Sequence, residues 1–235
     1  TEVDGRLLRV GEAVDRFYVL QNDGIYQSDA EVPVKDGKKM TVNGVEMKAG
    51  DPKWVDRNGD NKITDEDKVL KGHSLPKYTG GFSTQLKFKR FDLGASFFFA
   101  AGQSAMNYRA YQQYDFTTLD KGDNLAGVKE IFFWQSGNVP MDYPRYNALS
   151  EVHPYRADQD LYLEKVSYLK LRSVTLGYSV PTPKHDVYVY VSGNNLFTVS
   201  KFSGDDPELV DFDGYYRGYG MGIPRSVTLG VRCSF

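Results

Sequence analysis

The sequence has a single cysteine, Cys233, among its 235 residues. One cysteine excludes an internal disulfide framework and a cysteine-rich zinc site. Long apolar runs are also missing. The longest is the five-residue stretch 97–101, whereas a helix that crosses a bilayer needs about 20 residues. Membrane-spanning helices are therefore excluded.

Neither sign of charge dominates the sequence. The 29 Lys and Arg residues nearly balance the 31 Asp and Glu residues, for a formal net charge of −2, which argues against a nucleic-acid partner. No basic stretch is followed by an apolar run, so we predict no signal peptide in this chain. The mean hydropathy is −0.49, and composition alone favours a soluble β-sandwich or barrel.

Aromatic residues and glycine are abundant. The chain contains 17 Tyr, 14 Phe and 23 Gly, a composition typical of strands joined by turn-rich loops. The decisive pattern has a period of two and predicts strands with one apolar and one wet face. It is strictest in 226–235, where small or polar residues alternate with Val227, Leu229, Val231, Cys233 and Phe235.

Similar alternation predicts about six strands in all. A tight turn at Lys89-Arg90 joins the second and third of them as a hairpin. The only helical pattern, Asn124 to Trp134, is assigned to a loop. The predicted strands cover Arg16 to Gln27, 82–88, 91–99, 162–180, 187–197 and 226–235.

The connections between these strands differ in length. Lys89-Arg90 and Pro181 to Asp186 are short, whereas 28–76, 103–160 and 200–222 are long. Short turns at one end and long loops at the other are typical of an outer-membrane β-barrel. Aromatic residues near the predicted strand ends fit the interfacial girdles of such a barrel, namely Tyr162, Tyr168, Tyr178, Tyr188, Tyr190, Phe197 and Phe202.

Six strands cannot close a barrel of useful size, and they would leave two unpaired edges. We therefore predict an all-β fold, a transmembrane antiparallel β-barrel with long extracellular loops. Residues 1–235 would contribute about six C-terminal strands of a longer barrel, or would pair with missing strands in a complex. The apolar side of these strands would contact outer-membrane lipid.

The segment 56–67 has the spacing of an EF-hand calcium loop. Its side-chain oxygens occupy loop positions 1, 3, 5, 9 and 12, position 7 offers a backbone carbonyl, and Ile63 is the apolar anchor. Position 6 is Asn61 rather than Gly, and Asn tolerates the left-handed conformation. The alternative is a turn in which carboxylates cap their own backbone. The candidate calcium ligands are Asp56, Asn58, Asp60, Lys62, Thr64 and Asp67.

Catalytic patterns are scarce, and we predict that the chain is not an enzyme. His73, His153 and His185 stand in loops without matching acidic or cysteine partners. The acidic pairs Asp205-Asp206 and Asp211/Asp213 are interpreted as solvated loop acids. The sequence contains no GxSxG, HExxH or phosphate-binding loop.

Several motifs in order resemble the C-terminal part of the SusC/RagA-type TonB-dependent outer-membrane transporters of Bacteroidetes. The resemblance covers nearly the whole chain. It departs from the family's pattern at Asn61, where Gly is common. The matching segments are Val10 to Glu12, Asp23 to Ser28, Gly50 to Asp60, Ile63 to Asp67, Gly72 to Gly81, Phe91 to Leu93, Tyr168 to Tyr178, Val189 to Phe197, Asp206 to Glu208 and Ile223 to Phe235.

This resemblance implies a 22-stranded barrel with an N-terminal plug domain in the bacterial outer membrane. It also implies a SusD-like surface lipoprotein that helps to capture oligosaccharides or peptides, and energy from the TonB–ExbB–ExbD complex. The plug and the TonB box would lie in a region that this chain does not contain. The chain itself would supply barrel wall and extracellular loops, with the calcium-type loop 56–67 inside one of them.

Two sets of residues are assigned roles on this basis. Val231, Cys233 and Phe235 resemble the terminal signal read by the barrel-assembly machinery. Loop aromatic residues are candidates for contact with substrate or with the SusD-like lid, and the alternative for each is packing within the loop. They are Tyr108, Tyr111, Tyr114, Trp134, Tyr143, Tyr146, Tyr215, Tyr216 and Tyr219.

Two other classes of function remain open from the sequence. One is a porin or adhesin barrel that works without energy input. The other is a secreted, calcium-stabilised, carbohydrate-binding β-domain. The sequence does not name the substrate.

Overall fold

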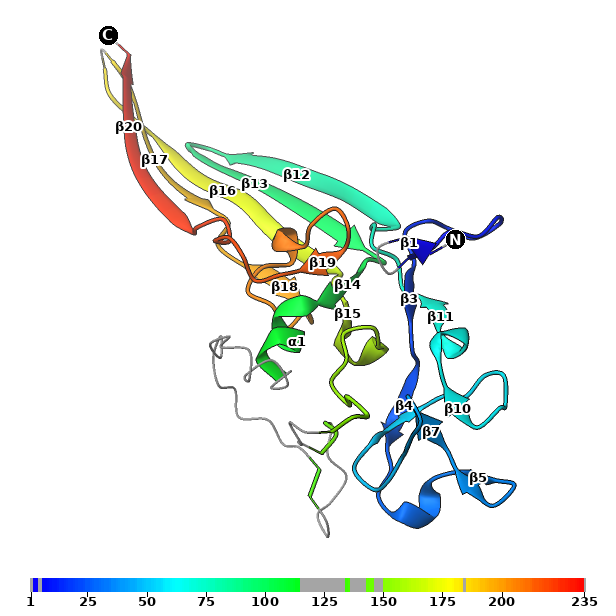
Figure 1. Cartoon of the computed structure of the whole chain (residues 1–235). Coiled ribbons are helices and arrows are strands. Elements are labelled where there is room, and N and C mark those ends of the chain that lie inside the picture. Colours follow the sequence, from blue (N-terminus) through cyan, green and yellow to red (C-terminus); the bar gives the residue numbers. More distant parts are fainter. Residues whose placement is uncertain are drawn as a thin grey trace. The chain divides into compact units, whose positions relative to one another are not determined.

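The computed structural model describes residues 2–3, 6–114, 134–135, 143–145, 150–183 and 185–234. The chain folds into two compact units (Figure 1). Unit 1 comprises residues 1–72 and 106–163, and unit 2 comprises residues 73–105 and 164–235. In the described ranges, no helix has both the length and the apolar character needed to cross a membrane.

Unit 2 is built on a six-stranded antiparallel sheet, which we call the wall. Its strand order is β12-β13-β16-β17-β20, and a short strand, β18, pairs with β16 beyond the end of β17. The strands are β12 (Tyr78–Phe88), β13 (Phe91–Ala101), β16 (Tyr168–Val180), β17 (Asp186–Asn194), β18 (Thr198–Ser200) and β20 (Ser226–Ser234).

The short connections lie at one end of the wall, as predicted. Strands β12 and β13 pair from Tyr78/Ala101 to Phe88/Phe91, so only two residues form their turn. Lys89 in that turn has a φ of +55°, the left-handed conformation that tight hairpin turns require. The connection between β16 and β17 lies at the same end, because Phe91 pairs with Tyr178.

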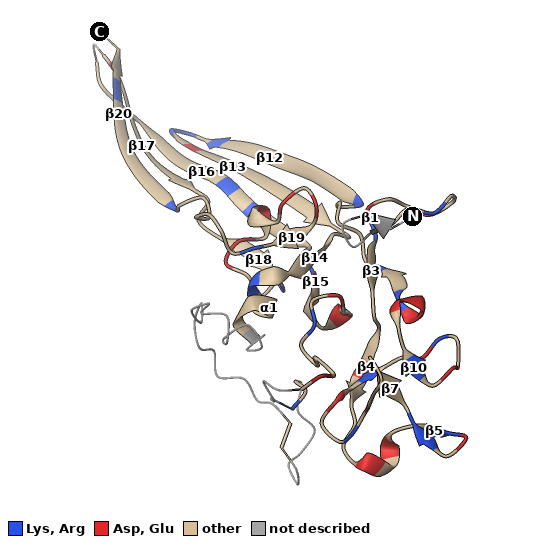
Figure 2. Cartoon of the chain, in the orientation of Figure 1, with Lys and Arg blue, Asp and Glu red and all other residues tan. Residues whose placement is uncertain are grey.

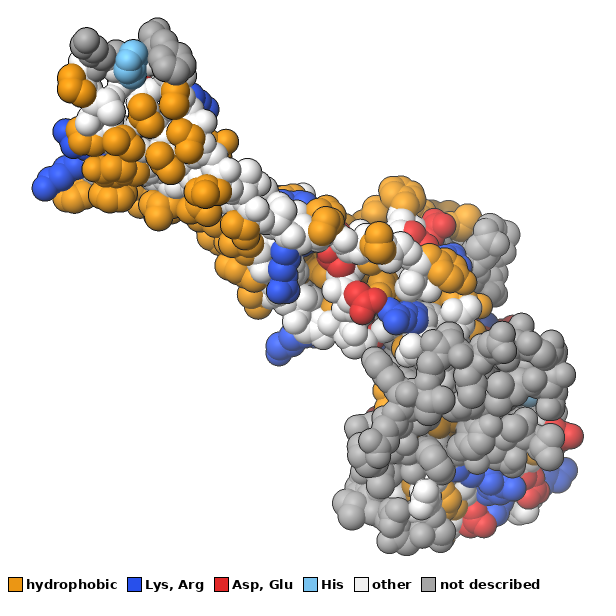
Figure 3. Space-filling view, turned by 90° about the vertical axis from the view of Figure 1, so that its left-hand side faces the viewer, with side chains coloured by type: hydrophobic (Ala, Val, Ile, Leu, Met, Phe, Trp, Pro, Cys, Tyr) orange, Lys and Arg blue, Asp and Glu red, His pale blue; other side chains and the backbone are white. Residues whose placement is uncertain are grey.

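The wall has an apolar face and a polar face, and the register of the strands keeps them separate. Leu93 pairs with Leu176, Leu176 with Val191, and Val191 with Leu229. The intervening positions are small or polar, as in the Thr175–Ser192 pair, whose hydroxyl oxygens lie 3.0 Å apart. Figure 3 shows hydrophobic side chains gathered along the wall. Large exposed residues of the apolar face include Phe82, Leu86, Phe88, Phe91, Leu93, Leu176, Val191, Val227, Leu229 and Val231.

One irregularity preserves this separation along the full length of β16. Ser96 pairs with Ser173, but the next pair is Phe97 with Leu171, so Arg172 is an extra residue in the ladder. A bulge of this kind re-aims the side chains that follow it. Here it keeps Leu171 on the apolar face and places Lys170 on the polar face, opposite Phe98.

Tyrosine rings on the polar face lie over glycines of the neighbouring strands. A Cβ atom on Gly177 would lie 1.8 Å from the Tyr188 hydroxyl oxygen, and one on Gly230 would lie 2.3 Å from Tyr190 Cζ. The Tyr188 hydroxyl donates a 2.8 Å hydrogen bond to Asp92. The predicted interfacial girdle is therefore wrong for Tyr188 and Tyr190, because both share a face with Asp92.

Besides the wall, the chain has a smaller sheet, and unit 2 has an apolar core. The sheet has the order β15-β14-β19, with β15 at Leu163–Lys165, β14 at Ser104–Asn107 and β19 at Tyr215–Tyr216. Strands β14 and β15 are only partly within the residue range of unit 2. Ala105, Val166, Phe202 and Tyr216 form the core, and Leu209 and Val210 pack against it. A 3₁₀ turn, Pro207–Leu209, supplies Leu209.

Unit 1 consists of short strands and turns rather than a continuous sheet. Its pairs are β1-β2, β11-β3, β4-β9 and β5-β6, with a three-stranded set β10-β7-β8. Its helical segments are α1 (Tyr108–Tyr114) and 3₁₀ turns at Asp29–Glu31, Asp65–Asp67 and Asp160–Tyr162. The strands are β1 (Glu2–Val3), β2 (Arg6–Leu7), β3 (Phe17–Val19), β4 (Asn22–Ile25), β5 (Val34–Lys35), β6 (Lys38–Lys39), β7 (Thr41–Val42), β8 (Val45–Glu46), β9 (Pro52–Trp54), β10 (Lys62–Ile63) and β11 (Val69–Lys71).

A buried apolar cluster holds these short elements together. Fully buried Gln159 joins it to the chain after residue 150, because its side-chain oxygen accepts a 2.9 Å hydrogen bond from Trp54 Nε1 and its amide nitrogen donates to the Pro154 and Arg156 carbonyls. The cluster comprises Leu20, Tyr26, Val32, Met40, Val42, Met47, Trp54, Ile63 and Val152.

Three sequence predictions of elements need correction. The candidate strand Arg16 to Gln27 is two short strands, β3 and β4, that pair within unit 1 and not with the wall. The predicted strand 162–180 is interrupted between Lys165 and Tyr168. In the segment 187–197, regular pairing with β16 and β20 extends to Asn194, and the backbone of Asn195 and Phe197 still bonds to Arg172 and Leu171 of β16. The helical pattern at 124–133 lies outside the described residues.

We predict that Gly177→Ala destabilises the wall by about 1–3 kcal/mol, because the new methyl group displaces the Tyr188 ring and its bond to Asp92. Gly94→Ala is the matched control, since it lies on the same face and its Cβ would meet nothing within 4 Å. Denaturant unfolding of the protein measures the stability of both variants. Equal stability of the two variants would contradict the packing described here.

Candidate functional site

Loop 56–67 folds around its own carboxylates. Asp56 accepts hydrogen bonds from the amides of Gly59 (2.7 Å) and Asn61 (2.8 Å). Asn58 and Asp60 each cap the amide two residues further on, at 2.9 and 2.8 Å. Asn61 adopts a φ of +66°, which confirms the expectation that asparagine supplies the left-handed position.

The buried acid of the loop is Asp67, which is 0% exposed. One of its oxygens accepts from the Arg57 amide (2.8 Å) and the other from the Thr64 amide (2.9 Å). Thr64 caps Glu66 in return, which makes a reciprocal capping box around Asp65–Asp67. The predicted anchor, Ile63, is part of the buried cluster of unit 1.

These contacts correspond to the capping alternative for the loop. Within the described residues, no group of three or more His, Cys, Asp or Glu side chains is arranged to hold a metal ion. The oxygens of Asp56, Asp60 and Asp67 instead satisfy backbone amides. The calcium ligands proposed from the spacing therefore stay a prediction.

A charge network borders the loop. The Lys68 ammonium lies 2.8 Å from Asp65 and 2.9 Å from Asp158, and Arg156 also pairs with Asp158. Burial opposes ionisation of Lys68, but the hydrogen bonds that its ammonium donates to Asp65 and Asp158 outweigh burial and raise the pKa of Lys68. Burial likewise opposes ionisation of Asp158, and Arg156 and Lys68 together lower its pKa. The network therefore keeps Asp158 ionised at neutral pH.

An open hollow of about 570 Å³ adjoins the loop and is lined in part by Tyr26, Lys35, Lys53 and Asp56. Burial and the nearby carboxylates of Asp51 and Asp56 raise the pKa of Tyr26 to about 12, so the phenol is neutral. Lys53 pairs with Glu31 at 2.6 Å, and Lys35 donates to the Gly59 carbonyl. Both lysines of this hollow are thus engaged within unit 1.

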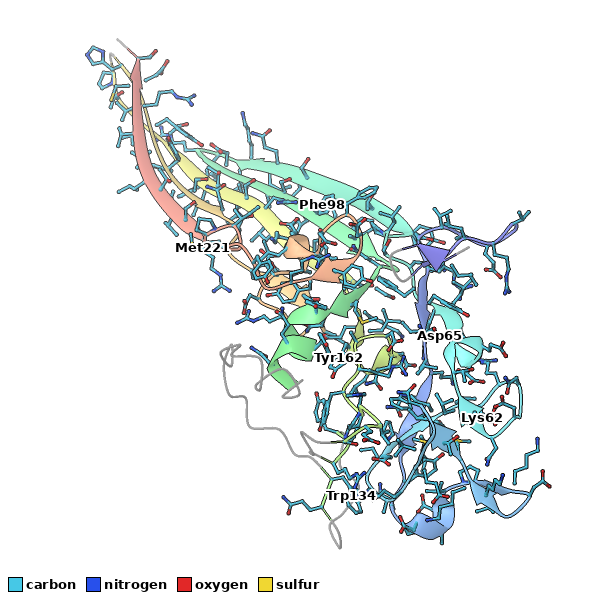
Figure 4. All side chains as sticks on the ribbon, in the orientation of Figure 1. Lys62, Asp65, Phe98, Trp134, Tyr162 and Met221 are labelled. Carbon is cyan, nitrogen blue, oxygen red and sulfur yellow. The ribbon has the colours of Figure 1, made fainter. Side chains whose placement is uncertain are left out.

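Several aromatic candidates of unit 1 lie in packing positions, and Figure 4 labels the candidate Trp134 and the buried ring of Tyr162. Tyr108 and Tyr111 lie on α1, with ring centroids 5.1 Å apart, and Tyr111 also contacts the buried ring of Tyr162 at 5.7 Å. Tyr114 is the last residue of the helix. These residues occupy a helix that the sequence had suggested as loop, and Tyr146 lies outside the described residues.

Trp134 and Tyr143 belong to a clasp on Gly50-Asp51. The Arg145 guanidinium binds fully buried Asp51 at 2.9 Å, and its amide donates to the Gly50 carbonyl. Gly50 has a φ of +86°, and a Cβ there would lie 2.5 Å from the Trp134 ring. The Trp134 amide donates to the Tyr143 carbonyl, and its indole nitrogen donates to Gln27 at 3.1 Å.

The three tyrosine candidates of unit 2 differ in exposure. Tyr216 is 1% exposed and belongs to the core of the unit, so packing accounts for it. Tyr219 is 70% exposed and remains a candidate for contact. Tyr215 carries the Arg217 guanidinium at 5.1 Å from its ring centroid. By residue range, six of the nine candidates belong to unit 1 and three to unit 2.

The sequence analysis missed a group of paired charges on the polar face of the wall. Lys170 is 1% exposed and lies 3.1 Å from Asp206 and 2.5 Å from Glu208. Arg172 also pairs with Glu208. Asp206 is therefore not the solvated loop acid that the sequence suggested. The sequence does contain one signal for this group. Lys170 stands on the polar side of an alternating strand, where the other residues are mostly small.

Two of the three assembly-signal residues are described. Val231 and Cys233 pair with Val189 and Val187 on the apolar face of the wall, and Cys233 is exposed. Phe235 lies outside the described residues. The assembly role stays a prediction.

The wall and its two faces can be compared with known proteins. The chain matches no established family profile. It is 30% identical over 211 residues to TonB-dependent receptor P3 of Formosa agariphila, which covers 86% of this chain and 19% of that receptor. It is 26% identical over 239 residues to TonB-dependent receptor SusC of Bacteroides thetaiotaomicron, covering 97% of this chain and 20% of SusC.

The comparison of folds agrees with the comparison of sequences. The RagAB peptide importer in its open-open state aligns with a TM-score of 0.61 and 19% identity, covering 99% of this chain and 23% of the importer chain. The chain thus spans about a fifth of the length of the relatives that it matches. By sequence and by fold, it belongs to the SusC/RagA family of TonB-dependent receptors.

Proposed function

We propose that the chain forms part of the barrel wall, with extracellular loops, of an outer-membrane receptor that imports oligosaccharides or peptides. The observation that carries this proposal is the division of the wall into an apolar and a polar face. Exposed large side chains such as Phe82, Leu86 and Leu229 lie together on one face. Lipid satisfies such a face, whereas soluble proteins rarely expose apolar patches of this kind.

The comparisons support the energy source and the partner at the level of the family. Relatives named TonB-dependent receptors suggest coupling to the TonB–ExbB–ExbD complex. SusC and the two-component RagAB importer suggest a SusD-like lipoprotein as the partner. We place both contacts in the full-length protein, where residues outside this chain take part.

The alternatives make different demands on the wall. A secreted, carbohydrate-binding β-domain would have to cover the apolar face, because exposure of that face to water costs free energy in proportion to its area. A porin or adhesin without energy input would satisfy the same face with lipid. Energy dependence therefore separates the proposal from the porin alternative.

We predict that cells which lack the full-length receptor lose uptake of one class of labelled oligosaccharide or peptide. Uptake in wild-type cells should stop when TonB is deleted, because import depends on the proton-motive force. Affinity purification of the tagged receptor should also recover a SusD-like lipoprotein. Uptake that persists without TonB would favour the porin alternative.

A matched pair of variants tests the lipid-facing assignment. Leu229 lies on the apolar face and its neighbour Thr228 on the polar face, where it pairs with Ser192. We predict that Leu229→Arg costs about 2–4 kcal/mol, as expected for arginine facing lipid, whereas Thr228→Arg costs much less. Quantification of folded receptor in outer-membrane fractions measures the difference. Equal losses for the two variants would contradict the assignment.

Loop 56–67 gives a separate prediction. Asp67→Ala should speed hydrogen exchange at the Arg57 and Thr64 amides, because removal of a buried acceptor costs about 1–3 kcal/mol. Exposed Glu66→Ala is the control. Exchange is compared with calcium and with a chelator. Slower exchange in calcium that disappears in Asp56→Ala/Asp60→Ala would support a metal site, and no effect of calcium would leave capping as the role of the loop.

A further inference from the structure

Segment 201–222, which follows β18 and precedes β20, is folded against the polar face of the wall. We call it the ledge. Its backbone is bonded within itself, since the Asp211 amide donates to the Tyr215 carbonyl and the Gly214 amide to the Asp211 carbonyl. The Tyr216 hydroxyl binds Asp205 at 3.1 Å. A connection of this length is thus ordered by specific contacts.

The first attachment of the ledge is an ion-pair cluster. The Lys170 ammonium lies 3.2 and 3.1 Å from the two Asp206 oxygens and 2.5 Å from Glu208 Oε2. The Arg172 guanidinium approaches both oxygens of Glu208 and lies 5.0 Å from the ring centroid of Phe98. Strand β16 thus supplies both cations that bind the ledge, and Phe98 of the neighbouring strand β13 contacts one of them, Arg172.

The same carboxylates also shape the ledge itself. Asp206 caps the 3₁₀ turn at Pro207–Leu209 by accepting a 3.0 Å hydrogen bond from the Glu208 amide. That turn directs Leu209 and Val210 onto the core formed by Ala105, Val166, Phe202 and Tyr216. Charge pairing and apolar packing therefore depend on one local conformation.

We propose that Lys170 is the positioning residue that locks the ledge to the polar face of the wall, so that the ledge is a fixed part of the receptor and not a mobile loop. The inference goes beyond the proposed function. It rests on that function in one respect, namely that the polar face of the wall is turned toward the barrel lumen. Phe212, Tyr219 and Met221 extend from the ledge with 83%, 70% and 93% exposure, so the lock also fixes where these side chains stand.

The physical reason for a lock is the burial of Lys170. A buried ion pair contributes little when complete, but removal of one partner leaves the opposite charge buried and unpaired. To leave the wall, the ledge must break the pairs of Lys170 with Asp206 and Glu208. It must also break the pair of Arg172 with Glu208 and the 3.3 Å hydrogen bond that the Tyr168 hydroxyl donates to Glu208. Loss of Lys170 should therefore release Asp206 and Glu208 toward water and loosen the ledge.

Hydrogen exchange followed by mass spectrometry in the full-length receptor tests the proposal. Lys170→Met should speed exchange in peptides of residues 203–216 by about a hundredfold, while peptides of β12 and β17 keep wild-type exchange. Lys170→Arg should restore protection, since it keeps the charge. Lys201→Met, an exposed lysine at the start of the ledge, is the matched control and should leave exchange unchanged.

A neutral triple variant separates charge pairing from packing. Lys170→Met/Asp206→Asn/Glu208→Gln removes the lysine and both carboxylates, so it should recover only the part of the protection that Lys170→Met loses through unpaired buried charge. Wild-type exchange in Lys170→Met, or full wild-type protection in the triple variant, would overturn the lock, because packing alone would then hold the ledge. These measurements do not use uptake, so failure of the lock and failure of the import proposal remain distinguishable.

Discussion

The hydrogen-bond register of the wall is the constraint on which the rest of the unit depends. In a sheet with a period of two, a slip by one residue would transfer every side chain of a strand to the opposite face. The two-residue turn at Lys89-Arg90 fixes the register between β12 and β13. The extra residue Arg172 shifts the register between β13 and β16 by one residue. Because of that bulge, Leu171 stays with Phe97 on the apolar face while Lys170 reaches the polar face. The exposed apolar surface and the buried charge of Lys170 are therefore both set by the same hydrogen-bond register.

The two units are stabilised in different ways. The wall leaves its apolar side chains exposed within this chain, so its order comes from backbone pairing and from contacts on the polar face. Unit 1 instead buries Trp54, Leu20 and Met47 in a core and satisfies its turns with side-chain caps. Figure 2 shows the strands of the wall mostly without charge, while charged residues mark the turns of unit 1. The mixture explains why the averages of the sequence look like those of a soluble protein.

Local patterns predicted the wall well because its chemistry is local. Alternation and the Lys89-Arg90 turn identified β12, β13 and β20 without knowledge of their partners. The same reasoning failed for Arg16 to Gln27, because strands of three or four residues are decided by tertiary neighbours such as β9 and β11. It also missed the role of Asp206, whose partner Lys170 lies 36 residues away in the sequence. No local pattern reports whether a loop acid is solvated or buried.

The tyrosines that lie over Gly177 and Gly230 affect how far side chains rise above the sheet on its polar face. Each of these rings occupies the space that a side chain at the glycine would fill. Tyr188 and Tyr190 stack at 5.8 Å and an interplanar angle of 26°, which forms an aromatic layer along β17. The glycines at 177 and 230 therefore set how closely this aromatic layer approaches the backbone of the wall.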